Sequence, residues 1–254
     1  MRGRFWILIQ IAAVALFAGA SLMAALEVPH GGMPDEDGHA NYVKSIATGQ
    51  GLPIAESVTG VVTEEIDDGS RIAYASAQAH HPPVYHALVA VFYRMFRYNE
   101  TALFLSGRLL SALFGLISLL LLRSAIISVL PEGQDVAAAA LVVIAASPTF
   151  SFIMGSMNNE GLAALVVVLA IWLAAPVLST GRMSTARAAL LGMSIGLALV
   201  VKLTAVVAAM PVILAFVAFM THSTPPPNTN VRRRPANGCR CGCSWDPRCA
   251  MVCA

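Results

Sequence analysis

Long runs of hydrophobic residues, separated by short polar segments, dominate the first 220 positions of the chain. A helix needs about 20 mostly apolar residues to cross the hydrocarbon core of a bilayer. Residues 188–220 would form a helix of about 50 Å, which is too long for one crossing, so we expect a fold back at Lys202 into two short helices. Four other runs are predicted to cross once each: 5–26, 109–130, 136–154 and 162–178. The pattern therefore predicts an all-α membrane protein with about six transmembrane helices.

A polar segment, residues 27–104, separates the first two predicted spans and is expected to form a large first loop. Residues 83–96 are apolar on much of their surface but too few to cross, so they predict an interfacial or re-entrant helix. The first part of the loop predicts a short amphipathic helix on the membrane, because these residues recur at helical spacing: His39, Tyr42, Val43, Ile46 and Ala47.

Basic residues near the predicted spans indicate the topology, since cytoplasmic loops carry an excess of Lys and Arg. If residues 83–96 do not cross, the basic groups fall on one side: Arg2, Arg4, Arg182, Arg187 and Arg232 to Arg234. We therefore expect a multi-pass protein of the plasma or inner membrane with a cytoplasmic N-terminus. Residues 27–104, 156–160 and the Lys202 turn then lie outside. A cleaved signal peptide ending at Ala18-Gly19-Ala20 is the alternative for the first span.

Composition agrees with a membrane protein, because 57% of the residues are hydrophobic and 12% are charged. A soluble domain carries about 25% charged residues. The loop 27–104 holds 10 of the 14 acidic residues, while much of the positive charge lies at the ends of the predicted spans. The net charge of +2 therefore describes no single surface, and nucleic-acid binding is not indicated.

The last 34 residues differ in kind from the rest. Residues 1–220 are expected to form one membrane-embedded module, and residues 221–254 an unstructured basic tail rich in Cys and Pro. All 5 cysteines lie between Cys239 and Cys253. Their Cys-x-Cys-x-Cys spacing and odd number fit neither a common zinc site nor a set of disulfides well. Our hypothesis is that the tail arises from out-of-frame reading of a GC-rich gene.

Five short patterns stand out in or beside the apolar runs. In chain order they are Pro34-Asp35-Glu36-Asp37-Gly38-His39, His80-His81-Pro82-Pro83-Val84-Tyr85, Arg108-Leu109-Leu110-Ser111, Ser156-Met157-Asn158-Asn159-Glu160-Gly161 and Gly196-Leu197-Ala198-Leu199 leading to Lys202-Leu203-Thr204. Their order and spacing resemble the GT-C superfamily of integral-membrane glycosyltransferases, in particular protein-mannosyltransferase-like enzymes that use polyprenyl-phosphate sugars. Two patterns depart from the family, since Asp37 stands where proline is frequent and Glu160 where aspartate is common.

The resemblance implies inverting transfer of a sugar from a polyprenyl phosphate to an acceptor protein, lipid or glycan at the extracytoplasmic face. No cluster of ligand residues in the sequence requires a metal, and no other cofactor is expected. Such chemistry needs a base for the acceptor hydroxyl and cations for the leaving phosphate. Asp35 is the candidate base, with Glu36 as its orienting neighbour, and Arg108 and Lys202 are the candidate phosphate ligands. The candidates for substrate positioning are His80, His81, Tyr85, Asn158, Asn159 and Glu160.

Other interpretations remain open from the sequence. The acids 35–37 could cap a helix, Arg108 could anchor its helix at the interface, and residues 158–160 could be a polar connection. Prolines after His80 and His81 fit a helix start. At the level of the whole chain, a transporter fragment and a non-catalytic membrane protein are the competing classes.

Overall fold

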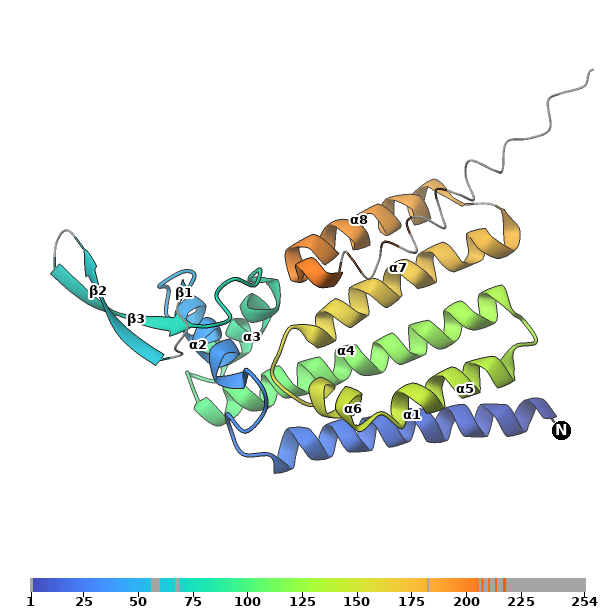
Figure 1. Ribbon diagram of the computed structural model, residues 1–254, viewed down its shortest axis with the longest axis horizontal. Helices are drawn as coiled ribbons and strands as arrows, with labels where there is room; N and C mark the ends of the chain where they lie inside the picture. Colours follow the sequence, from blue (N-terminus) through green and yellow to red (C-terminus); the bar gives the residue numbers. More distant parts are fainter. Residues whose placement is uncertain are drawn as a thin grey trace, which may run out of the picture.

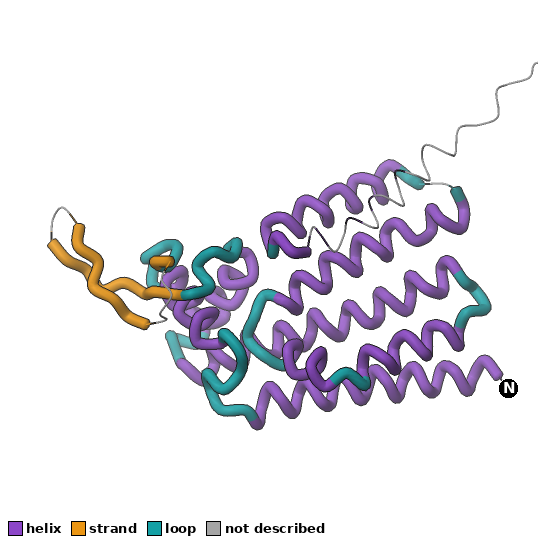
Figure 2. The backbone as a smooth tube through the Cα atoms, viewed as in Figure 1, coloured by secondary structure: helices purple, strands orange, loops and turns teal. Residues whose placement is uncertain are grey.

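A bundle of long helices forms most of the molecule, and a smaller subdomain covers one of its ends (Figure 1). The computed structural model describes residues 2–55, 60–66, 69–181 and 183–205, together with 207, 210, 213 and 217. The chain starts at the end of the bundle opposite the subdomain (Figure 2). The predicted tail, 221–254, lies outside the described residues.

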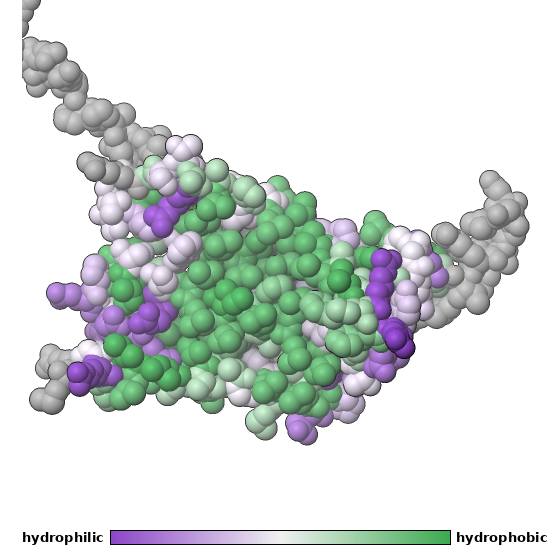
Figure 3. Space-filling view, turned by 180° about the vertical axis from the view of Figure 1, so that it is seen from behind, coloured by the Kyte–Doolittle hydropathy of each residue, from purple (hydrophilic) through white to green (hydrophobic). Residues whose placement is uncertain are grey.

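In the described part of the chain the bundle contains six helices: α1 (Arg2–Glu27), α4 (Glu100–Val129), α5 (Gln134–Ala145), α6 (Pro148–Met154), α7 (Glu160–Thr180) and α8 (Thr185–Val201). Within the described residues, three of them (α1, α4 and α7) are long and apolar enough to cross a membrane, and α5 with α6 would make a fourth. A central band of hydrophobic surface lies between two ends where polar residues gather (Figure 3). The membrane setting is therefore confirmed, whereas the predicted total of about six spans is not.

The third predicted span, 136–154, is broken. Helix α5 ends at Ala145, and α6 starts at Pro148 with its axis bent by 72°. Proline has no N–H and favours the first turn of a helix, and Ser147 caps the new helix by accepting the N–H of Phe150.

Lys202 ends α8, where the sequence predicted a fold back. Its backbone is extended, with φ −162° and ψ 128°, and its N–H donates to the carbonyl of Ala198 at 3.0 Å. The expected break at this residue is therefore confirmed, while most of the run that follows lies outside the described residues.

The subdomain is built from residues 28–99 and contains more than the two predicted helices. Helices α2 (Glu36–Ala47) and α3 (Val84–Met95) are accompanied by a three-stranded sheet in the order β1-β3-β2: β1 (Ile54–Ala55), β2 (Gly60–Ile66) and β3 (Gly69–Ser76). Strand β1 pairs parallel with β3, and β2 pairs antiparallel with it, from Gly60 opposite Ala75 to Ile66 opposite Gly69. The prediction of an all-α chain is wrong for this loop.

One apolar core joins the subdomain to the bundle. It includes Tyr85 and Val89 of α3, Leu103 of α4, Val166 of α7 and Val201 of α8. Helices α4 and α7 approach closely, since a Cβ on Gly161 would lie 2.8 Å from the carbonyl oxygen of Ser111. The ends of α4, α7 and α8 nearest the subdomain are thereby fixed against α2 and α3.

Candidate functional site

Asp35 lies directly before α2 with its carboxyl group at the surface. Its backbone is left-handed (φ 59°), which is uncommon for a residue other than glycine, and its carbonyl accepts the N–H of His39 at 3.1 Å. Its side chain makes no capping hydrogen bond. The described residues contain no hydrogen-bond donor to this carboxylate, so the capping interpretation does not account for Asp35.

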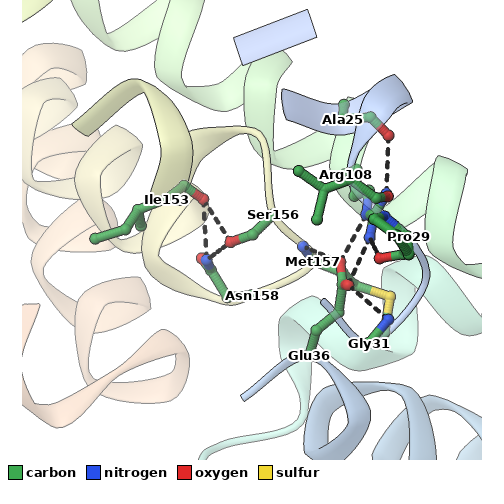
Figure 4. Close-up of polar contacts among 10 residues, drawn as sticks. Ala25, Pro29, Gly31, Glu36, Arg108, Ile153, Ser156, Met157 and Asn158 are labelled. Carbon is green, nitrogen blue, oxygen red and sulfur yellow. Dashed lines mark hydrogen bonds and ion pairs between the residues drawn. The ribbon is translucent and has the colours of Figure 1, made fainter. Parts of the chain in front are cut away.

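Glu36 points the other way and is completely buried. Its two carboxylate oxygens accept Nε and Nη2 of Arg108, each at 2.7 Å (Figure 4). They also accept the backbone N–H groups of Gly31 and Met157, each at 3.1 Å. A buried carboxylate needs such a set of partners to offset the loss of hydration.

The rest of the Arg108 guanidinium is bound by backbone carbonyls at the end of α1. Nη1 donates to Ala25 at 3.0 Å and to Val28 at 2.6 Å, and Nη2 donates to Pro29 at 2.8 Å. These bonds and the two to Glu36 use all five N–H donors of the group. The side chain is 2% exposed. Arg108, predicted to bind phosphate, is thus occupied by protein acceptors.

Lys202 forms an ion pair with Glu160 at the start of α7. The lysine side chain is 15% exposed and that of the glutamate 45%, so the pair borders solvent. Asn159 supports the end of α8 by donating to the Val201 carbonyl at 3.4 Å, and Asn158 accepts the Glu160 N–H at 2.8 Å. Residues 158–160 therefore hold the two helix ends that present this pair.

His81 lies where charges from separate parts of the site act together. Burial, followed by the positive charges of His80 and Lys202, lowers its pKa to about 4, although the carboxylates of Glu160 and Asp35 act in the opposite direction. All four groups thus act on the same imidazole. The structure gathers Asp35, His80, His81, Glu160 and Lys202 at one end of the bundle.

Three ring residues beside His81 were not among the predicted site residues. His39 Nδ1 and His86 Nε2 share a hydrogen bond of 2.8 Å, and the His86 ring stacks on Tyr42 with centroids 3.9 Å apart. Tyr42 donates its hydroxyl to the His81 carbonyl at 2.9 Å. Burial, together with the charges of His81 and Lys202, lowers the pKa of His39 to about 3. These neutral, stacked rings hold His81 in place.

Tyr85 and Asn158 are buried among the helices. The Tyr85 hydroxyl donates to the Gly107 carbonyl at 2.9 Å and lies 3.0 Å from Ser111 Oγ. Ser111 Oγ in turn donates to the Asn158 carbonyl at 3.1 Å. This chain connects α3, α4 and the turn before α7, so both residues act on the site through its framework.

An apolar groove of 640 Å³ begins beside this site. Glu160, the first residue of α7, is one of its lining residues. Residues of α6, α7 and the segment after Lys202 form its walls: Phe150, Ile153, Met154, Ala163, Ala164, Val167, Val168, Thr204 and Ala205. Among the residues the structure describes, no group of three or more His, Cys, Asp or Glu could hold a metal ion.

Helices that are long and apolar enough to cross a bilayer define the chain as a membrane protein. The chain belongs to the dolichyl-phosphate-mannose-protein mannosyltransferase family, which it matches over residues 80–227, more than half its length. The family points to a glycosyltransferase of the mannosyltransferase type, and it implies a lipid-linked sugar donor. The match contains all the predicted site residues except Asp35 and Glu36. Comparisons with curated proteins and with solved structures found no match.

Proposed function

We propose that the chain transfers a sugar from a polyprenyl phosphate to an acceptor hydroxyl at the extracytoplasmic face, with inversion at the sugar carbon. The observation that carries the proposal is the exposed Asp35 carboxylate, which shares the environment of His81 with Lys202. A base and a cation at one membrane surface are what transfer from a lipid phosphate needs.

In the proposed step, the acceptor oxygen attacks the anomeric carbon of the sugar while the bond from that carbon to the phosphate oxygen breaks. Asp35 takes the proton of the attacking hydroxyl, and the phosphate leaves with the bonding electron pair. The polyprenyl phosphate departs without needing a proton. Lys202 stabilises the negative charge that collects on the phosphate.

We assign Glu36 and Arg108 to the support of Asp35. The pair joins the end of α1, the start of α2 and the turn before α7, and Glu36 is the next residue after the base. Because Arg108 has no N–H donor left for a ligand, Lys202 is the better candidate for the phosphate. This changes the role expected for Arg108 from contact with substrate to positioning.

The apolar groove beside Glu160 suits the lipid part of the donor. A prenyl chain lying along α7 would place its phosphate next to Lys202, which follows α8 directly. On donor binding, Lys202 would leave its ion pair with Glu160 and form one with the phosphate. His80, Lys202 and Asp35 all act electrostatically on His81, so we expect the sugar and the acceptor to meet near these two histidines.

A comparison of donors tests the proposal. Membranes that contain the chain would receive labelled polyprenyl-phosphate mannose or, separately, labelled nucleotide mannose. Transfer from the lipid donor alone is expected, and Lys202→Gln should raise the KM for this donor by about tenfold or more, since a charge-assisted contact is lost. Arg97→Gln, which changes an exposed arginine, is the control. Equal transfer from the nucleotide donor would contradict the proposal.

A further inference from the structure

Helix α4 carries two arginines, and their surroundings differ sharply. Arg108 lies near the subdomain end, and protein acceptors use all five of its N–H donors. Arg123 lies six residues before the last residue of the helix, about 9 Å from that end at about 1.5 Å per residue. It makes one hydrogen bond in the described part of the chain, from Nε to Gln10 Oε1 at 2.6 Å.

Gln10 fixes the direction of the Arg123 guanidinium. This glutamine is 2% exposed, and its Nε2 donates to the backbone oxygen of Gln134 at 2.8 Å and to the Gln134 side chain at 3.0 Å. The amide is therefore held between α1 and α5. Its orientation is fixed because its nitrogen donates to Gln134 while its oxygen accepts from Arg123. The two Nη groups of Arg123, with four N–H donors, form no hydrogen bond within the described residues.

A second cation lies at the same end of the bundle. Arg187 stacks over the Trp172 ring at 5.8 Å, and Trp172 donates to the hydroxyl of Ser124, the neighbour of Arg123, at 2.9 Å. The nearby acids are Glu132 in the turn after α4 and Asp135 in the first turn of α5, and in the described structure neither forms an ion pair with Arg123. A guanidinium in a membrane helix with unpaired donors is costly unless it meets water or a phosphate.

We propose that Arg123 is the centre of a binding site for the phosphate of an anionic phospholipid, at the end of the bundle that carries the N-terminus. Two parallel N–H groups match two phosphate oxygens, and basic positions between helices at a membrane surface bind acidic headgroups. Arg187, stacked on Trp172, adds a second positive charge at the same end of the bundle. This site is separate from the Asp35 region. Arg108, which contacts Glu36 beside Asp35, lies toward the start of α4, whereas Arg123 lies near its end.

Lipid titration of the purified full chain, followed by native mass spectrometry, tests the site. The probes are phosphatidylglycerol, phosphatidylcholine and inorganic phosphate. We expect preferential binding of phosphatidylglycerol, and Arg123→Gln should weaken it by about fivefold, the factor that corresponds to about 1 kcal/mol for one arginine near a charged surface. Arg97→Gln, at the opposite end, should bind as the unchanged chain does.

Gln10→Glu provides a variant that keeps the guanidinium but gives it a carboxylate partner. It should weaken phosphatidylglycerol binding to a similar extent. If Arg123→Gln does not fold, the binding measured for Gln10→Glu tests the proposal in its place. Equal binding of phosphatidylcholine or of inorganic phosphate alone would overturn the proposal. So would phosphatidylglycerol binding that both variants retain.

Discussion

Asp35 and Glu36 are adjacent carboxylates with opposite surroundings. The left-handed backbone at Asp35 leaves its side chain exposed, whereas Glu36 is fully buried against Arg108. A positive φ in a residue other than glycine costs free energy, so the surrounding contacts must hold it. The Glu36 bonds to Arg108, Gly31 and Met157 provide such contacts on the residue that follows.

Breaking the buried ion pair should destabilise the protein strongly. Arg108→Met leaves Glu36 buried without its cation, which we expect to lower the free energy of unfolding by about 3–5 kcal/mol. Arg97→Met removes an exposed arginine and should have little effect. Thermal unfolding in detergent measures both, and the double variant Glu36→Gln/Arg108→Met should regain part of the loss. An Arg108→Met protein as stable as the Arg97→Met protein would contradict this role.

The buried histidines predict how stability depends on pH. Folding lowers the pKa of His39 from 6.5 to about 3 and that of His81 to about 4. Between these values and 6.5 the unfolded chain binds more protons than the folded one. The free energy of unfolding is therefore undiminished by these histidines above pH 6.5, and it falls as the pH decreases below that value. The unfolding temperature should therefore drop steadily below this pH.

Comparison with His39→Asn separates this effect from the titration of carboxylates. The variant lacks one lowered pKa, so its unfolding temperature should fall less steeply over the same range. Identical slopes in the two proteins would show that His39 does not contribute.

From the sequence, the chemically important residues could be predicted better than the contacts that they make. Asp35, Glu36, Arg108 and Lys202 stand out as charges beside apolar runs. The contact between Glu36 and Arg108 spans 72 positions and depends on how α1, α2 and α4 meet, which no local pattern specifies. His39 and His86 were missed as partners for the same reason, since their contact spans 47 positions.

At the scale of the elements, apolar length predicted the helices well and their ends poorly. The second span was expected from 109, but α4 begins at Glu100, because Asn99 caps it by accepting the N–H of Ala102. The sheet was missed, since β2 and β3 gain their stability from pairing with each other. The bend at Pro148 could have been found from the proline itself, which starts a helix more readily than it continues one.

Gly155 should be essential to the packing of α6 against α1. A Cβ at this position would lie 2.5 Å from the backbone oxygen of Ser21 and 2.8 Å from Ala24 Cβ. Gly155→Ala therefore forces the two helices apart and should destabilise by about 1–3 kcal/mol. Gly192→Ala in α8 meets nothing within 4 Å, so it should leave stability equal or raise it slightly. Thermal unfolding compares them, and equal values would refute the close contact.

At the scale of the whole molecule, the account requires the subdomain to lie outside the cytoplasm. Replacing the natural cysteines, which all lie in 239–253, permits single cysteines to be placed at Glu64 in β2 and at Ser184 before α8. A membrane-impermeant thiol reagent added to intact cells should modify the first and spare the second. The reverse labelling would overturn the orientation. Labelling at both positions would exclude a single crossing by α7 between the outer face and a cytoplasmic Ser184.

The rate of sugar transfer in an Asp35→Asn variant tests the central claim most directly. Asparagine keeps the shape of the side chain but cannot accept the hydroxyl proton, so transfer from labelled polyprenyl-phosphate mannose should fall by about 100- to 10,000-fold. Stability should be unchanged, because no donor to this carboxylate was found in the described structure. Asp37→Asn makes the same change two positions later and should retain activity. Full transfer by Asp35→Asn, or an equal loss in both variants, would contradict the assignment of Asp35 as the base.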